Sequence, residues 1–183
     1  MDNQTRATFD NLLSPDGPVR NTALNASLQA TDQPVDWAYE VWDELLERLR
    51  HTDGHQRAIA STLLCNLAKS DPQNRMLTDF DTILAVTRDA KFVTARHTLQ
   101  ALWKVGAAGP KQRQLVVDRL AGRFKDCAAE KNCTLIRFDI IQGLRHLCDA
   151  VKDENIKAVA LALIETEPDL KYRRKYAGVW RSA

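Results

Sequence analysis

Apolar residues recur along this chain at intervals of three and four positions, and charged residues fill many of the positions between them. In the segment 35–51, VDWAYEVWDELLERLRH, apolar side chains share one helical face and acidic side chains occupy the other. Short turns that contain Pro, Gly, Asp or Ser, such as SPDGP and SDPQN, separate segments of this kind. The pattern predicts an all-helical protein.

A longer period underlies the helical one. An arginine recurs in five of the predicted helices at spacings of 37, 39, 41 and 37 residues, as Arg20, Arg57, Arg96, Arg137 and Arg174. The residue three positions after each arginine is apolar, which places it on the same helical face every time. We therefore predict a single repeat domain over residues 1–183, built of helical hairpins with approximate ranges 1–32, 33–70, 71–108, 109–150 and 151–183.

Two units carry an Asp-x-x-x-Arg pattern, through Asp16 with Arg20 and Asp53 with Arg57. The other three units have Phe92, Cys133 and Leu170 where the aspartate would be. With the small and large apolar residues that follow each arginine, these units resemble the HEAT-repeat family. The resemblance implies a right-handed α-solenoid of about five HEAT-like helical hairpins, and it implies no particular ligand.

We interpret the recurrent aspartates and arginines as structural. An aspartate near a helix start interacts favourably with the helix dipole, and an arginine one turn later can bridge to it or to a neighbouring repeat. A position used in every repeat is what stacking between neighbours requires, so a catalytic role is the weaker alternative. The predicted structural ladder comprises Asp16, Arg20, Asp53, Arg57, Arg96, Arg137 and Arg174.

Stacked hairpins present a concave surface formed by their second helices. If the residues three, six and ten positions after each arginine point inward, those one, five and eight positions after it point to the concave side. This side is neutral near Asn21, Asn25 and Thr62 and becomes basic from the third unit onward. The predicted basic face comprises His97, Lys104, Arg145 and Lys175, with Lys171, Arg173 and Arg181 from the C-terminal segment.

The formal net charge is +2, from 26 basic and 24 acidic residues. The overall charge of the protein therefore does not indicate a polyanionic partner. The segment 171–183 holds five basic residues and no acidic one, which leaves residues 1–170 with a net charge of −3. We expect a protein or acidic peptide partner, because the local charge is small beside the about six to ten phosphate contacts of a strong duplex binder. Nucleic acid is the alternative ligand, and a solubilising terminal cap is the alternative interpretation of the basic end.

The sequence contains none of the common motifs for hydrolysis or nucleotide binding, such as a glycine-rich phosphate loop, a Gly-x-Ser-x-Gly elbow or His-Glu-x-x-His. Cys127 and Cys133 are separated by five residues and lack the paired spacing of a zinc site, even with His146 and Cys148 further on. We therefore expect no metal, no cofactor and no catalytic residue, and we take the four cysteines as reduced thiols. A non-catalytic binding scaffold is the favoured interpretation.

One enzyme class is kept as an alternative. A family of DNA glycosylases for alkylated bases is built on HEAT-like repeats, with tryptophans and an acidic residue around the damaged nucleotide. The nearest local likeness is VWDELL, which contains Trp42 and Asp43. The helical pattern places Trp42 among the apolar positions and Asp43 on the solvated side, which favours a core role for the tryptophan.

The N-terminus has no basic segment followed by an apolar run, and nowhere do eighteen apolar residues run together. We therefore expect a cytoplasmic protein without membrane association, and a monomer.

Overall fold

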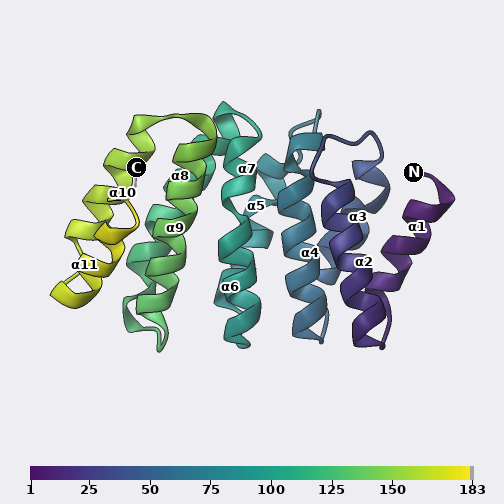
Figure 1. Ribbon diagram of the computed structural model, residues 1–183, viewed down its shortest axis with the longest axis horizontal. Coiled ribbons are helices and arrows are strands. Elements are labelled where there is room, and N and C mark those ends of the chain that lie inside the picture. Colours follow the sequence, from purple (N-terminus) through teal and green to yellow (C-terminus); the bar gives the residue numbers. More distant parts are fainter. Residues whose placement is uncertain (182–183) are drawn as a thin grey trace. The chain divides into compact units, whose positions relative to one another are not determined.

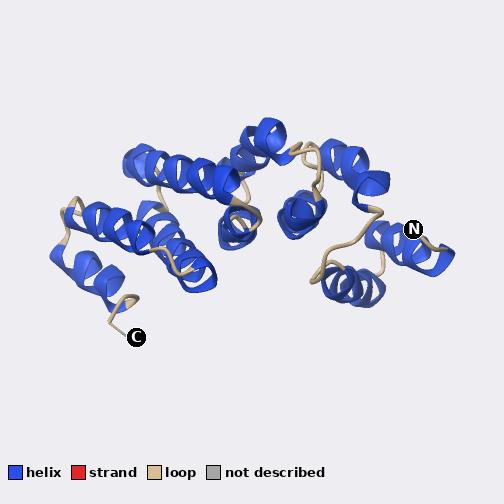
Figure 2. Cartoon of the chain, turned by 90° about the horizontal axis from the view of Figure 1, so that it is seen from above, coloured by secondary structure: helices blue, strands red, loops and turns tan. Residues whose placement is uncertain are grey.

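The computed structural model describes residues 1–181, and those residues form helices and connecting loops without a β-strand (Figures 1 and 2). The all-helical prediction is thereby confirmed, whereas the solenoid arrangement stays a prediction. The α-helices are α1 (Asn3–Asp10), α2 (Gly17–Ala30), α3 (Ala38–Arg48), α4 (Gly54–Leu67), α5 (Met76–Ala85), α6 (Phe92–Ala101), α7 (Trp103–Ala107), α8 (Pro110–Asp126), α9 (Cys133–Val151), α10 (Glu154–Glu165) and α11 (Leu170–Gly178).

Each predicted hairpin range contains two of these helices, apart from two differences. The third range, 71–108, also contains the short helix α7, and α9 ends at Val151, one residue beyond the fourth range. The chain forms two compact units, Met1–Thr98 and Leu99–Ala183, and the division falls within α6.

Aspartates fix the starts of several helices. Asp16 accepts a hydrogen bond from the backbone N–H of Val19 at the start of α2, and Asp53 accepts one from the N–H of His55 at the start of α4. Asp2, Asp153 and Asp169 cap α1, α10 and α11 in the same way. An N-cap of this kind satisfies an amide that the helix itself leaves unpaired. The helix-start position predicted for Asp16 and Asp53 is therefore confirmed.

The core of the first unit is built from the stripe that the sequence predicted for residues 35–51. Val41, Trp42, Leu45 and Leu49 are buried. Trp42 donates a hydrogen bond from Nε1 to the Asp79 carboxylate at 2.9 Å, so its one polar atom is satisfied. Apolar residues of α4 and α5 complete this core, among them Leu63, Leu64, Phe80 and Ile83.

In the second unit, the last helix is packed onto the preceding hairpin. Tyr176 of α11 is fully buried, and its hydroxyl donates to the backbone carbonyl of Thr134 at 2.8 Å. Its ring lies 6.3 Å from the rings of Phe124 and Phe138. Burying an apolar side chain of this size contributes about 1.5–3 kcal/mol, so α11 is an integral part of this unit.

A glycine lies where α7 packs against α9. A Cβ atom placed on Gly106 would lie 2.7 Å from Cδ2 of Leu147. A side chain at position 106 would therefore require the buried Leu147 side chain to shift, whereas glycine leaves this packing undisturbed.

Candidate binding surface

The arginine of the second hairpin connects that hairpin to the next. Arg57 pairs through Nε and Nη2 with the two carboxylate oxygens of Asp89, the Nη2 contact being 2.8 Å. Its Nη1 donates to the carbonyls of His51 and Thr52, in the loop before its own helix. The guanidinium holds the pKa of Asp89 below its usual range. This two-point charged contact gives Arg57 the bridging role predicted for the ladder.

The third hairpin also has an aspartate, Asp89, before its second helix, although Phe92 occupies the position four residues before Arg96. The Asp89 carboxylate accepts a hydrogen bond from the N–H of Lys91 at 2.8 Å, just before α6 begins at Phe92. An aspartate thus precedes α6 as well, but it lies seven residues before Arg96 instead of four, and Phe92 is the first residue of the helix. Arg96 itself lies half-buried on α6.

The fourth hairpin repeats the bridge with a different carboxylate. Arg137 of α9 donates from Nη1 to Glu167 at 2.8 Å and from Nε to the carbonyl of Phe124 at 3.1 Å. The Glu167 side chain is 3% exposed and the Arg137 side chain 12% exposed. The pair thus joins α9 to the loop before α11 inside the protein, as Arg57 and Asp89 join their two hairpins.

In the fifth hairpin, Arg173 rather than the predicted Arg174 makes the contacts that Arg20 and Arg57 make in theirs. Arg20 donates to the carbonyl of Ser14 and Arg57 to that of His51, in each case six residues earlier. Arg173 makes the same link to the carbonyl of Glu167, at 2.7 and 2.9 Å. Four residues before it, Asp169 caps α11, as Asp16 and Asp53 cap their helices.

Two residues of the predicted basic face, Arg145 and Arg173, have structural contacts. Arg145 pairs with Asp149 at 2.7 Å, donates to the carbonyl of Val179 at 3.3 Å, and places its guanidinium 5.4 Å from the ring centre of Trp180. It therefore holds the turn after α11 against α9. Arg145 was placed on the basic face from the repeat pattern, which gives no information on Val179 and Trp180, 34 and 35 residues further along the chain.

The remaining members of the predicted basic face differ in exposure. His97 is exposed on α6 in the first unit, and Lys104 is half-buried on α7 in the second. Exposed basic residues gather on α11 and the turn that follows it. We call this group the α11 cation cluster; it consists of Lys171, Arg174, Lys175 and Arg181.

Three members of this cluster share one side of the helix, because Lys171, Arg174 and Lys175 are spaced by three and four residues. Lys175 places its ammonium 4.5 Å from the ring centre of Phe138 on α9, and Lys171 lies 5.8 Å from that of Tyr172. No acidic residue occurs within α11. The cluster thus presents like charges beside aromatic rings.

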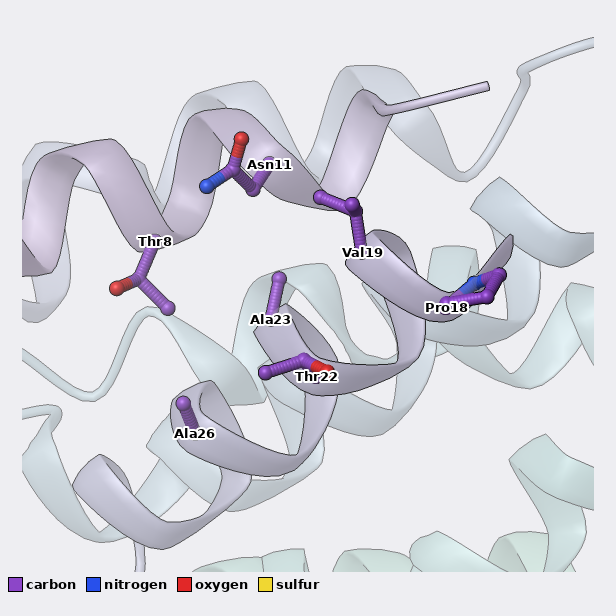
Figure 3. A pocket seen from close by; sticks show the side chains of 7 residues that line it. All are labelled: Thr8, Asn11, Pro18, Val19, Thr22, Ala23 and Ala26. Atoms are coloured by element: carbon purple, nitrogen blue, oxygen red, sulfur yellow. The ribbon is translucent and has the colours of Figure 1, made fainter. Parts of the chain in front are cut away.

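A cavity of about 340 Å³ lies between α1 and α2 in the first unit (Figure 3). Its lining consists of small apolar groups, two hydroxyls and one amide, from Thr8, Asn11, Pro18, Val19, Thr22, Ala23 and Ala26. None of these side chains titrates near neutral pH, so this lining offers no general acid or base. A second cavity, of about 460 Å³ between α8 and α10, includes Arg113 and Asp153, which pair at 3.4 Å.

The structure brings together neither a metal-ligand cluster, within the described residues, nor the Trp42 and Asp43 pair considered for glycosylase chemistry. Within the described residues there is no group of three or more His, Cys, Asp or Glu side chains that could hold a metal ion. Trp42 is fully buried and bonded to Asp79, so its ring is not free to stack on a base, while Asp43 is exposed and pairs with Arg75. Residues 1–181 also include no helix with the length and apolar character needed to span a membrane.

Comparisons with known proteins identify no relative: no protein-family model matches this chain, and no curated protein matches it.

Proposed function

We propose that this chain is a non-catalytic binding scaffold of HEAT-like hairpins, and that its second unit binds an acidic segment of a protein partner. The links between consecutive hairpins support the repeat part of the proposal. Arg57 reaches a carboxylate 32 residues further on and Arg137 one 30 residues further on, as expected when each hairpin packs on the next.

The observation that carries the binding part is the α11 cation cluster. The guanidinium groups of Arg137, Arg145 and Arg173 are bonded to carboxylates or backbone carbonyls of the protein itself. Lys171, Arg174 and Lys175 are exposed on one side of α11, where a ligand carboxylate could reach them. Phe138 and Tyr172 beside them would contact apolar side chains of the same ligand. An acidic peptide that also carries apolar residues therefore fits this surface.

Nucleic acid is the second candidate, since phosphates would meet the same cations. We favour the peptide because four clustered cations fall short of the about six to ten phosphate contacts of a strong duplex binder. The cytoplasmic location and the monomeric state expected from the sequence belong to the same proposal.

The test is a binding measurement by fluorescence anisotropy with two labelled probes, a peptide of alternating Glu and Leu and a single-stranded oligonucleotide of equal charge. The wild type is compared with Lys171→Glu/Lys175→Glu. The matched control, Lys111→Glu/Lys157→Glu, makes the same change of charge on α8 and α10 of the same unit.

We expect the α11 variant to lose at least tenfold in peptide affinity while the control stays within twofold of the wild type, a difference of about 1.4 kcal/mol or more. If both variants lost the same amount of peptide affinity, the loss would come from the change in net charge and not from the position of the cations on α11. Tighter binding of the oligonucleotide than of the peptide would select the nucleic-acid alternative.

A further inference from the structure

Two thiols of the second unit lie close together outside the surface described above. The Sγ atoms of Cys127 and Cys133 are 3.0 Å apart. Cys127 belongs to the 3-10 turn Cys127–Ala129 after α8, and Cys133 is the first residue of α9. A disulfide requires a separation of about 2.05 Å, so an approach of about 1 Å would bring the two sulfurs to bonding distance.

The surroundings give the two thiols different properties. Cys133 is half-exposed and is the first residue of the 19-residue helix α9. Cys127 is fully buried, and its Sγ also lies 3.3 Å from the carbonyl of Phe124, to which it can donate. Burial raises the pKa of Cys127 to about 12, against the smaller opposing effect of Arg137 and Arg123. Cys133 is thus the accessible thiol and Cys127 the protonated one behind it.

We propose that Cys133 and Cys127 form a reversible redox modification site, in which a hydroperoxide oxidises Cys133 and Cys127 then closes an intramolecular disulfide. This inference is independent of the proposed binding function. It also departs from the sequence expectation that all four cysteines stay reduced.

The chemistry balances with hydrogen peroxide as the oxidant. The Cys133 sulfur attacks one peroxide oxygen, the O–O bond breaks, and the departing hydroxide takes the thiol proton to form water, which leaves a sulfenic acid on Cys133. The Cys127 sulfur then attacks the Cys133 sulfur, the S–O bond breaks, and the second hydroxide leaves as water with the Cys127 proton. Two thiols lose two electrons and become one disulfide, and one peroxide becomes two waters.

The bond would form at the base of the helix that supports α11. Thr134, next to Cys133, accepts the hydroxyl hydrogen bond of Tyr176. Arg137, one turn further, carries the buried pair with Glu167. The disulfide would therefore connect the end of α8 to the first turn of α9, where α11 is anchored.

The remaining two cysteines are internal controls for the test. Cys65 and Cys148 are both buried, and the Sγ of Cys148 lies 3.4 Å from the carbonyl of Asp153, to which it can donate. If the oxidant reacted with every thiol regardless of its surroundings, Cys65 and Cys148 would be oxidised as well. Oxidation that follows the geometry would select Cys127 and Cys133.

Peptide mapping of the full chain gives the direct readout. The reduced protein is treated with hydrogen peroxide, quenched with catalase, denatured, alkylated, and digested with trypsin without reductant. Cleavage after Lys125, Lys131 and Arg137 places the two cysteines in separate peptides, residues 126–131 and 132–137. We expect these peptides to be joined, with the loss of two hydrogen atoms, in most of the treated protein, and to separate on reduction. Cys65 and Cys148 should be alkylated as in untreated protein.

Single substitutions sharpen the assignment. In Cys127→Ser, dimedone should trap a sulfenic acid on Cys133, whereas in Cys133→Ser it should label Cys127 little or not at all. Cys148→Ser should still form the joined peptides. The proposal is overturned if wild-type protein forms no joined peptides, if all four cysteines oxidise equally, or if the link runs between two chains, which a non-reducing gel would reveal as a dimer. The wild-type map keeps the test decisive even if a variant at the buried Cys127 fails to fold.

Discussion

The two units use the same internal connections and carry opposite charge. Residues 1–98 contain 10 basic and 14 acidic residues, a net of −4, and residues 99–183 contain 16 and 10, a net of +6. Yet each unit has an arginine-to-carboxylate bridge, Arg57 with Asp89 in the first and Arg137 with Glu167 in the second. In both units, the arginine that connects two parts of the fold is therefore paired with a carboxylate. The two units differ in their net charge, and the exposed cations of α11 are the part of that charge on which the proposed function rests.

The largest effect on stability should come from breaking the more buried of the two bridges. Glu167→Ala leaves Arg137 buried without its carboxylate, and loss of one partner of a buried pair costs about 3–5 kcal/mol. Chemical denaturation measures the change in the free energy of unfolding. Glu165→Ala is the control, because this residue pairs with Arg173 at the surface and is 74% exposed, so we expect a change under about 1 kcal/mol. Equal effects of the two substitutions would contradict the account.

The bridge of the first unit should show a smaller effect that depends on pH. In Asp89→Asn, Arg57 keeps its bonds to His51 and Thr52, so we expect a loss of about 1–3 kcal/mol at pH 7. Arg57 lowers the pKa of Asp89 in the folded state, so the carboxylate stabilises the fold fully above its unfolded pKa of about 3.9. That contribution is lost as pH falls through the lowered folded value.

Unfolding measured across this range should therefore show wild type and Asp89→Asn converging at acidic pH. A constant difference from pH 7 down to the acid transition would mean that the Asp89 charge contributes nothing.

A third comparison tests the register of the last hairpin. Arg173→Ala removes two hydrogen bonds to the Glu167 carbonyl, which should cost about 1–2 kcal/mol. Arg174→Ala changes an exposed residue and should cost under about 0.5 kcal/mol. Thermal unfolding of the two variants side by side measures the difference. If Arg174→Ala proved more damaging than Arg173→Ala, Arg174, 37 residues after Arg137, would be the repeat arginine of the last hairpin.

The sequence alone predicted the helices well, since their apolar stripes and capping aspartates are local signals. It also identified Arg57 and Arg137 as structural. It missed Asp89 because the third hairpin places its aspartate seven residues before Arg96, where a fixed spacing of four finds only Phe92. The pattern Asp169-x-x-x-Arg173 was present in the sequence, but the repeat alignment placed Arg174, 37 residues after Arg137, at this position.

The candidate site was harder to predict because exposure depends on tertiary contacts. The repeat pattern places Arg145 and Lys175 on the same predicted face, yet the Arg145 side chain is 16% exposed and bound to Asp149, while Lys175 is exposed. No local pattern foretells that Trp180 and Val179 return to meet Arg145. For the same reason Arg145 is a poor residue for testing binding, since its replacement would also disturb the fold.

The salt dependence of peptide binding tests the central claim most directly. The affinity for the labelled Glu-Leu peptide is measured from about 50 to about 200 mM salt, for the wild type and for Lys171→Gln/Lys175→Gln, which removes two charges without introducing new ones. We predict that wild-type affinity falls steeply with salt and that the variant binds more weakly with a clearly shallower slope. If the two proteins have the same affinity and the same slope, the α11 cation cluster is a solubilising surface and the proposed binding site is wrong.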